Sequence, residues 1–401
     1  MHPRNARATG FALAVGVLTV ATATLAQEGA PVAAEAGPPG PTTYTENVAR
    51  TPDRTASAAA PAPEASKPVK LRWRDTWLIW DNSVTAQTLG IGKNYLSPNP
   101  TYEMSGSLRP RYYLYDGEID AFYVAGRVDV VREFTNSDVT TQRGETTLSD
   151  AILLTGYRRT LAASPGYETI LTTSLPILTF PTSKFSLDNG TILGLGTEAR
   201  ITQSMPLAGS KWPVFKTLSV GAIAGYNHTF TRSVVPTNEE LRRVRLDPLG
   251  RTVPGDQLVG AAFPEHELHF NARLIADITE KLSLFVEASY RPTWKYGFAD
   301  VAVCVQTGSC SNALNPTSPT RYVPLSSFEV AAFYDVIDEL SVAVGYVNLE
   351  QTTGLDGQRR SIFYSPGSQF YLSVIGHLDA IYLAASGKKG SASSTGTHLH
   401  P

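Results

Sequence analysis

The chain has 401 residues, of which 42% are hydrophobic and only 17% are charged. Because an ordinary soluble protein has about 25% charged residues, this composition indicates a surface that does not face water everywhere. The formal net charge of −2 provides neither a polycation for nucleic acid nor a polyanion for basic partners, so we expect no nucleic-acid partner.

The N-terminus has the three parts of a secretory signal peptide. Arg4 and Arg7 form a short basic region, residues 11–21 (FALAVGVLTVA) are apolar, and Thr24-Leu25-Ala26 is a small-x-small cleavage site. We therefore expect residues 1–26 to be removed after export. A signal anchor is the alternative, but it requires a longer apolar run. Outside this segment no run of about 18 apolar residues occurs, which excludes a polytopic α-helical membrane protein.

Residues 27–70 are dominated by Ala, Pro, Glu, Thr and Ser, as in the stretches PVAAEAGPPGP and ASAAAPAPEASKP. Such a segment cannot bury enough apolar surface to offset its chain entropy, so we expect a disordered periplasmic leader. The alternative is a cell-wall tether or an envelope-spanning spacer, because Pro-rich chains are semi-rigid.

From Arg72 onward, apolar and polar positions alternate in segments of ten to sixteen residues, as in transmembrane β-barrels. In the segment LSLFVEASYR, the apolar residues at 282, 284, 286, 288 and 290 would share one face, while Ser283, Glu287 and Ser289 would share the other. A helix would scatter the apolar set. We predict an all-β fold, a transmembrane antiparallel up-and-down β-barrel of about twelve strands, at 76–89, 102–115, 119–134, 148–161, 167–180, 190–204, 214–231, 265–278, 281–294, 325–337, 340–352 and 368–385.

The predicted connections alternate in length. Short ones are 116–118, 162–166, 206–213, 279–280 and 337–339, and long ones are 90–101, 135–147, 181–189, 232–264, 292–324 and 353–367. Bacterial outer-membrane barrels have short periplasmic turns and long extracellular loops. This alternation predicts an even strand number, with both ends of the chain on the periplasmic side.

Cys304 and Cys310 lie in one polar segment, CVQTGSC, within a long predicted loop. In an oxidising compartment this spacing predicts a local disulfide that stabilises the loop by about 2 kcal/mol. A metal site would need His or carboxylate companions at short spacing, and none is there.

These features resemble the class of Gram-negative outer-membrane β-barrels, over roughly residues 72–387. The stretches TWLIWDNSVTAQTLGIG and NPTYEMSGSLRPRYYLY look like uncharacterised, porin-like proteins of that class. The resemblance implies a place in the outer membrane, with its lipid and the barrel assembly machinery as partners. One departure is a polar tail at 388–401 in place of a terminal aromatic strand. Aromatic residues near strand ends fit the two membrane boundaries: Trp77, Trp80, Tyr112, Tyr113, Tyr115, Trp212, Trp294, Tyr296, Phe370, Tyr371 and Tyr382.

Charged residues fall on the face opposite the apolar one, with both signs in similar number. This face indicates a polar channel or ligand passage. The alternative is a closed barrel whose interior ion pairs fill the lumen. We expect the lumen to be lined by Glu103, Arg109, Arg111, Arg127, Asp129, Glu198, Arg200, Glu267, His269, Arg273, Glu287, Glu329, His377 and Asp379.

Enzyme motifs are weak. A lipid hydrolase would need a nucleophile and a base in reach of each other, and His228, His266 and His269 have no Ser in a recognisable motif beside them. On a strand, His266 and His269 face opposite sides, so they predict no metal site. We therefore expect no enzyme, no cofactor and no metal.

The sequence thus predicts four parts: a signal peptide at 1–26, a leader at 27–70, an outer-membrane barrel at 71–387 and a disordered tail at 388–401. The expected function is a passive or ligand-selective channel for small polar solutes. The alternatives are a structural or adhesive barrel whose long loops bind an external partner, and an outer-membrane lipid hydrolase.

Overall fold

The structure is a computed structural model that describes residues 70–91, 101–135, 144–164, 166–188, 190–207, 215–232, 234, 263–297, 321–353 and 359–387, and the backbone of 243–246, 252–255, 303–304 and 310–311. The predicted signal peptide, the tail at 388–401 and, apart from Lys70, the leader lie outside these residues. So do the side chains of Cys304 and Cys310.

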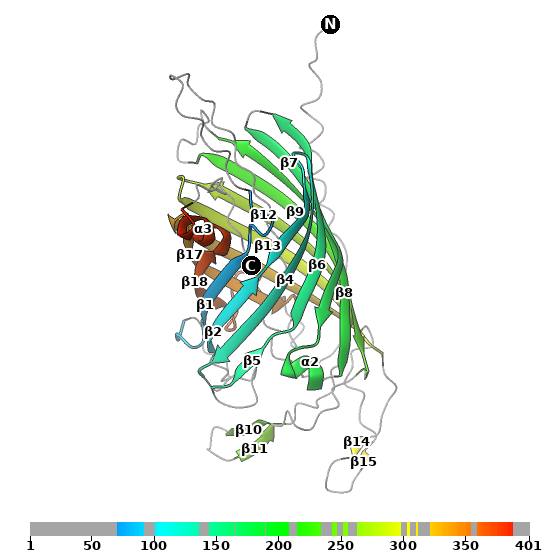
Figure 1. Ribbon diagram of the computed structural model, residues 1–401. Coiled ribbons are helices and arrows are strands. Elements are labelled where there is room, and N and C mark those ends of the chain that lie inside the picture. The colour runs from blue at the N-terminus through cyan, green and yellow to red at the C-terminus, as the bar shows by residue number, and fades with distance from the viewer. Residues whose placement is uncertain are drawn as a thin grey trace, which may run out of the picture.

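One antiparallel sheet closes into a barrel, seen as a tilted ring of strands in Figure 1. Each strand pairs with the next along the chain, and β1 also pairs with β18 while β2 pairs with β4, which closes the ring. Two of the crossings are interrupted, one at Pro110 and one at Ser149–Asp150. The strands of the ring are β1 (Trp77–Thr85), β2 (Tyr102–Arg109) continued by β3 (Arg111–Asp116), β4 (Asp120–Glu133), β5 (Thr146–Leu148) continued by β6 (Ala151–Ser164), β7 (Tyr167–Phe180), β8 (Thr191–Pro206), β9 (Thr217–Thr231), β12 (Pro264–Asp277), β13 (Leu282–Lys295), β16 (Tyr322–Ile337), β17 (Leu340–Gln351) and β18 (Gln369–His377).

These twelve crossings confirm the predicted fold class and strand number. The hairpins at one end, such as 338–339 between β16 and β17, are short except for 207–216 between β8 and β9, while most connections at the other end are longer. Five smaller elements among the described residues are not strands of the ring: α2 (Lys184–Asp188), the pair β10 (Arg243–Leu246) and β11 (Thr252–Gly255), and the pair β14 (Val303–Cys304) and β15 (Cys310–Ser311). Among the described residues, no helix is long and apolar enough to cross a membrane.

The last predicted strand is wrong in its second half. Residues 368–385 were expected to be one strand, but β18 ends at His377 and α3 (Leu378–Ala385) follows. β18 pairs with β1 as far as His377 opposite Trp77, where β1 begins, so the chain beyond has no strand to pair with. The sequence LDAIYLAA is rich in helix-forming Leu and Ala, and it turns into a helix there.

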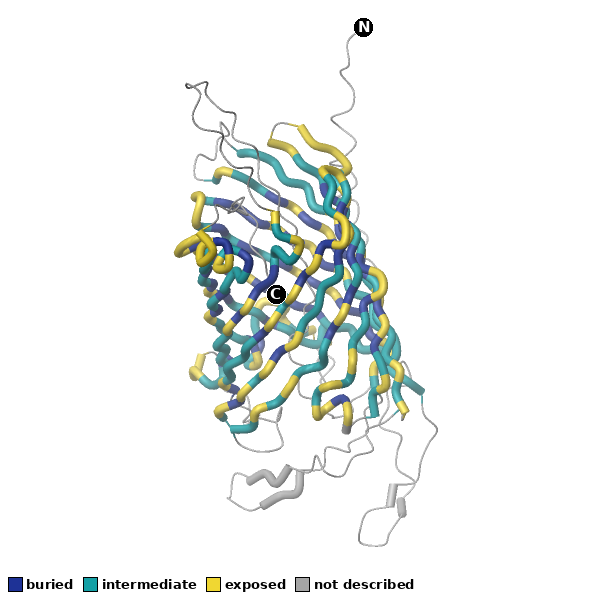
Figure 2. Tube along the Cα trace, viewed as in Figure 1, coloured by how far each residue is buried: buried dark blue, intermediate teal, exposed yellow. Residues whose placement is uncertain are grey.

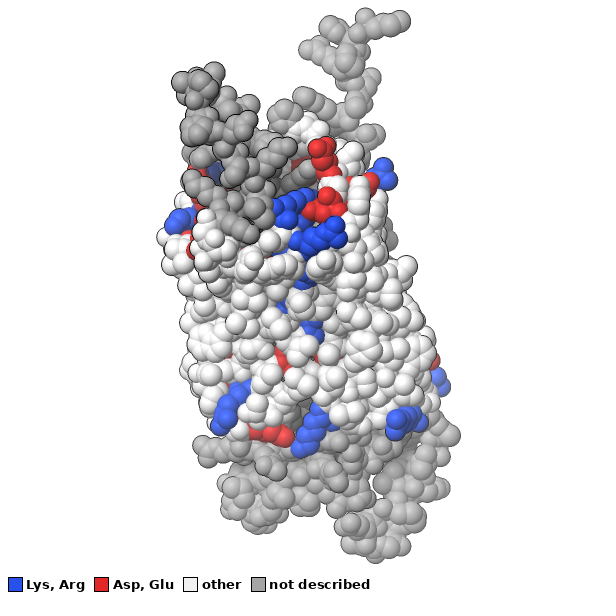
Figure 3. All heavy atoms as spheres, viewed as in Figure 1, with Lys and Arg blue, Asp and Glu red and all other residues white. Residues whose placement is uncertain are grey.

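The alternation of faces follows from the two-residue period of a β-strand. On β13, Ser283, Phe285, Glu287 and Ser289 are buried, whereas the residues between them are intermediate or exposed. Figure 2 shows the same banding of buried and exposed positions along the other strands of the ring. Large apolar side chains cover the outside, for example Leu78 at 51%, Leu114 at 50% and Val344 at 59% exposure. On the face of the barrel shown in Figure 3, the outer surface is mostly uncharged, and most of the charged atoms lie toward its two ends.

Glycines let aromatic rings lie flat against the inner wall. A Cβ at Gly156 would lie 2.0 Å from the ring of Tyr123, and a Cβ at Gly345 would lie 2.2 Å from the ring of Tyr371. Tyr123 and Gly156 are paired across β4 and β6, and Gly345 and Tyr371 across β17 and β18. Each ring therefore occupies the space that a neighbouring side chain would take.

Candidate functional site: the barrel lumen

The predicted lumen residues, with one exception, lie on strands of the ring at inward-facing positions. Seven of them, Arg111, Asp129, Glu198, Arg200, Arg273, Glu287 and Glu329, are only 3–6% exposed. The other six on strands are partly buried: Glu103, Arg109, Arg127, Glu267, His269 and His377.

Asp379 is the exception. It lies in the first turn of α3 and not on a strand, so the prediction that it lines the lumen from a strand is wrong. Its Oδ2 accepts a hydrogen bond from the backbone N of Asp75 at 3.2 Å, and this contact joins α3 to the segment that precedes β1. Burial raises the pKa of Asp379, and the negative charge of Asp75 raises it further.

An ion pair between Arg273 on β12 and Glu287 on β13 lies on one wall of the lumen. Arg273 donates to Glu287 Oε2 from Nε at 2.9 Å and from Nη2 at 2.6 Å. Asn271 donates to the other oxygen of Glu287 at 3.0 Å. The guanidinium of Arg273 also lies over the ring of Phe285, 5.2 Å from its centroid. Both carboxylate oxygens of Glu287 are thus held by neighbours on the same wall.

A second charged group spans β8 and β12. Arg200 Nη2 donates to Glu198 Oε1 at 3.1 Å, and His269 Nε2 lies 3.2 Å from Glu198 Oε2. Gly225 separates Glu198 from His269 in the pairing of the strands, and a Cβ there would lie 2.2 Å from the imidazole. The glycine therefore allows His269 to reach across β9. Arg200 Nε and Nη1 are buried without a hydrogen-bond partner, so its guanidinium is only partly satisfied by the protein.

Acidic residues dominate the wall built from β16, β1 and β2. Tyr371 on β18 donates to Glu329 at 2.8 Å, and Ser83 donates to Glu103 at 3.1 Å. Ser105 lies 3.5 Å from Asp81. In each of these three contacts the carboxylate accepts a hydrogen bond from a hydroxyl group.

Three of the predicted lumen arginines, on β2, β3 and β4, have different partners. Arg127 Nε donates to Asp129 at 2.6 Å, and Arg109 Nε donates to Ser107 at 3.0 Å. Arg111 lies 3.6 Å from Asp75 and 4.9 Å from the ring centroid of Tyr123. Arg111 therefore contacts the segment that enters the barrel before β1.

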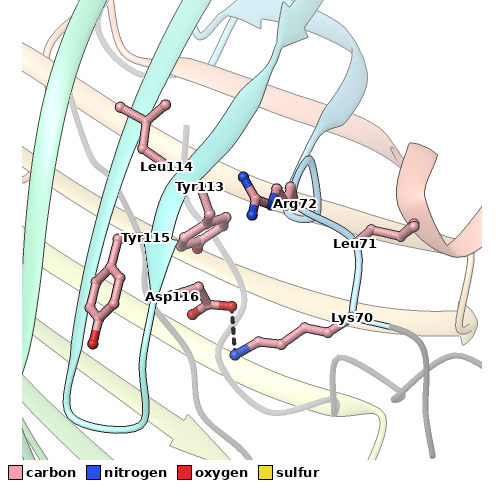
Figure 4. Close-up of a pocket in the computed structure, with 7 residues that line it drawn as sticks. All are labelled: Lys70, Leu71, Arg72, Tyr113, Leu114, Tyr115 and Asp116. Atoms are coloured by element: carbon pink, nitrogen blue, oxygen red, sulfur yellow. Dashed lines mark ion pairs between the residues drawn. The ribbon is translucent and has the colours of Figure 1, made fainter.

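This entry segment forms a pocket of about 330 Å³ with the end of β3, shown in Figure 4. Lys70 and Arg74 both contact the carboxylate of Asp116, at 2.5 Å and 2.6 Å. Burial opposes the ionisation of Asp116, but its hydrogen bonds to Arg74 and Lys70 outweigh this and lower its pKa. The guanidinium of Arg74 also lies 3.7 Å from the ring centroid of Tyr113. The pocket thus anchors the chain at the short-hairpin end of the barrel.

The interior also contains apolar side chains. One buried cluster includes Trp77, Ile79, Phe285 and Phe333, and another is built around Tyr113 and Tyr123. Trp77 and Tyr113 were expected at the membrane boundaries together with Tyr371, and this is wrong: Trp77 and Tyr113 are 6% and 1% exposed, and Tyr371 packs against the first cluster. Sequence reasoning did not single out Ile79, Tyr123, Phe285 and Phe333. Phe285 has the parity of Ser283 and Glu287, so the two-residue period was the signal that could have placed it inside.

Inward-facing charges at Asp81, Arg158, Arg291 and Asp335 were likewise missed, although their parity on the strands was available. Arg158 and Arg291 are each 8% exposed, and the Nε of each is buried without a hydrogen-bond partner.

A serine, a histidine and an aspartate meet inside the barrel, at the short-hairpin end. Ser341 donates to Asp335 at 2.6 Å and lies 2.9 Å from His377 Nε2. Because Asp335 holds the proton of the serine hydroxyl, His377 is not placed to remove it as a general base would. Ser341 is also only 1% exposed. The arrangement is that of a structural hydrogen-bond network.

No group of three or more His, Cys, Asp or Glu residues placed to hold a metal occurs in the described part of the chain. The three histidines considered as catalytic candidates do not share one site. His269 faces the lumen, whereas His228 and His266 are on the opposite face of their strands.

No protein-family model matches the chain. No curated protein matches it either. Several solved structures are similar. An outer-membrane channel from Pseudomonas putida F1 is 11% identical, over 79% of this chain and 99% of that one, with a TM-score of 0.46. The NanC porin is 6% identical, over 75% and 98%, with a TM-score of 0.34. The outer-membrane phospholipase from Salmonella typhi is 12% identical, over 77% and 92%, with a TM-score of 0.29.

Proposed function

We propose that this protein is an outer-membrane channel for small polar solutes. The observation that carries the proposal is the contrast between the two faces of the barrel. Charged and hydroxyl side chains line the inner face from Asp129 to Glu329, while the outer face exposes side chains such as Leu78, Leu114 and Val344. An apolar outer band around a polar interior is the arrangement of barrels that conduct through a membrane.

The outer surface supports the membrane location. A water-soluble protein rarely exposes a contiguous apolar surface of more than a few hundred Å². Here exposed apolar residues occur on strands around the ring, such as Leu108 on β2, Ile201 on β8 and Leu372 on β18. Contact with lipid on all sides accounts for this surface, and an interface with one partner protein does not.

The size of the barrel supports a small solute. Barrels of about eight strands are filled by their own side chains, and those of 16–18 strands enclose a wide aqueous channel. A ring of twelve strands lies between these cases. Its interior also holds rings such as Phe285 and Phe333, which narrow the passage further. Because both acidic and basic side chains line the wall, the passage suits polar molecules that carry either a positive or a negative charge.

Liposome swelling tests the proposal. The folded protein in liposomes should admit glycerol and small sugars or amino acids and exclude larger oligosaccharides. Ser289 and Ala288 on β13 provide a matched pair, since Ser289 is buried inside and Ala288 is exposed outside. Ser289→Trp should slow the swelling several-fold, and Ala288→Trp should leave it unchanged.

A closed structural barrel is the second candidate, and the low exposure of the Arg273–Glu287 pair favours it. Its prediction is that folded protein gives no swelling even with glycerol. In that case the long connections, and not the lumen, would carry the function.

We also propose a disulfide between Cys304 and Cys310, and a cleaved signal peptide at residues 1–26. The pairing of β14 with β15 supports the disulfide, because it sets Cys304 opposite Cys310. Opposed positions on antiparallel strands bring Cβ atoms within about 4.5–5.5 Å.

A further inference from the structure

Two histidines and a tyrosine meet on the outer face of the barrel, away from the lumen. His228 on β9 and His266 on β12 are direct partners in the strand pairing, and Tyr226 precedes His228 by two residues on the same face. All three lie toward the long-connection end of their strands, where 232–263 joins β9 to β12. The proposed channel uses none of these side chains.

The polar atoms of the three residues converge on one point. His228 Nδ1 and His266 Nδ1 lie 3.1 Å apart, and the Tyr226 hydroxyl lies 2.7 Å from His266 Nδ1. Neighbouring rings hold both imidazoles in place: Phe230 lies 4.3 Å from the ring centroid of His228, and Tyr226 stacks on His266 at 5.9 Å.

The other nitrogen of His266 has a carboxylate beside it. His266 Nε2 lies 3.4 Å from Glu265 Oε1, which favours the proton on Nε2. Nδ1 of His266 then carries a lone pair that faces His228 and accepts a hydrogen bond from the Tyr226 hydroxyl, and a bound ion would replace this hydrogen bond. A histidine that binds a metal commonly donates its other N–H to a carboxylate in this way.

The separation of the two Nδ1 atoms fits a shared cation. Two nitrogens bound to one Zn²⁺ at about 2.0–2.1 Å with tetrahedral geometry are about 3.3 Å apart, and a smaller bond angle brings them closer. Imidazole suits Zn²⁺, Cu²⁺ and Ni²⁺, whereas Mg²⁺ and Ca²⁺ prefer oxygen ligands.

We propose that His228 and His266 form a two-imidazole site for a divalent transition-metal ion on the outer rim of the barrel, with the phenol of Tyr226 next to the ion. Water completes the coordination, because within the described residues no third His, Cys, Asp or Glu converges there. The bound ion links β9 to β12 at the two ends of the 232–263 connection, so it acts as a clamp on the base of that connection.

Metal titration of the folded protein in detergent micelles tests this site. Zn²⁺ and Cu²⁺ are titrated separately, by calorimetry or against a chromogenic chelator, with the tail histidines replaced (His398→Asn, His400→Asn) as the reference protein. The reference should bind one ion per chain. Adding His228→Asn or His266→Asn should weaken binding at least tenfold, and Tyr226→Phe should weaken it less. Heat-modifiable migration on gels shows that each variant is folded.

Electron paramagnetic resonance of the Cu²⁺ complex adds a measurement that does not depend on affinity. Coupling to two imidazole nitrogens should be visible in the reference protein and reduced to one in His228→Asn. The proposal is overturned if both single variants bind within twofold of the reference, if replacing the tail histidines removes all binding, or if millimolar Mg²⁺ displaces Zn²⁺ as effectively as Cu²⁺ does.

Discussion

Replacing Glu287 by leucine should be one of the more damaging single substitutions in the barrel. Glu287 is 3% exposed and accepts bonds from Arg273 at 2.6 Å and 2.9 Å and from Asn271 at 3.0 Å. Glu287→Leu removes the carboxylate to which Nε and Nη2 of Arg273 donate, and the guanidinium that loses these bonds is itself in a residue only 5% exposed. Removing one partner of a buried ion pair lowers the free energy of unfolding by about 3–5 kcal/mol. Because water in the proposed channel can hydrate Arg273, we expect a loss near the lower end of this range.

A double variant separates the loss of the pair from the loss of packing. Arg273→Met with Glu287→Leu removes both charges, so most of the stability should return. Ala288→Leu, on the lipid side of the same strand, should change the free energy of unfolding by less than about 0.5 kcal/mol. Urea unfolding in lipid vesicles, followed by tryptophan fluorescence, measures all three. The reasoning is refuted if Glu287→Leu unfolds within about 1 kcal/mol of the wild type, or if the double variant is as unstable as the single one.

Four further predictions use other parts of the molecule. Val286→Arg places a charge on the lipid face and should lower the stability of the assembled barrel by about 2–4 kcal/mol. Ser105→Arg, beside Asp81 on the inner face, should be tolerated. Equal heat-modifiable fractions of the two variants on gels would contradict the assignment of faces. Because the pKa of Asp116 is lowered, its carboxylate stabilises the entry segment fully at pH values above the ordinary carboxyl pKa of 3.8, and this stabilisation is lost as the pH falls through the lowered pKa. Acid should therefore speed hydrogen exchange at residues 71–76 in the wild type but not in Asp116→Asn. The raised pKa of Asp379 means that its charged form destabilises the folded contact, so the packing of residues 378–385 against the barrel should become more stable as the pH falls toward 3.8. Hydrogen exchange in this segment that does not change with pH would contradict this prediction. Membrane-impermeant thiol reagents should label Cys304 and Cys310 in intact cells only after mild reduction, and a need for permeabilised cells would invert the topology.

The barrel could be predicted from the sequence because a strand repeats every two residues. Alternation along β13 placed Glu287 inside and Val286 outside without knowledge of any partner strand. The end of β18 could not be found this way. Its limit is set by the first residue of β1, Trp77, which pairs with His377 and lies 300 positions earlier in the chain, so the helical LDAIYLAA segment and Asp379 were predicted as strand.

Contacts between side chains on different strands could not be predicted from the sequence either, because they depend on the register between segments far apart in the chain. Parity shows that His269 and Glu198 face inward, but only the pairing through Gly225 brings them to 3.2 Å. In the sequence, His228 and His266 were considered only as catalytic histidines, and they had no serine in a recognisable motif beside them. Their meeting depends on the register of β9 against β12, which no local pattern reveals.

The central claim is that the polar interior is a passage through the membrane, and single-channel recording in planar lipid bilayers tests it most directly. The protein, shown to be folded by heat-modifiable migration, should insert and give discrete conductance steps, and Ser289→Trp should reduce the step size while Ala288→Trp does not. Inserted, folded protein that gives no steps in either salt or solute gradients would contradict the channel and establish the closed barrel in its place.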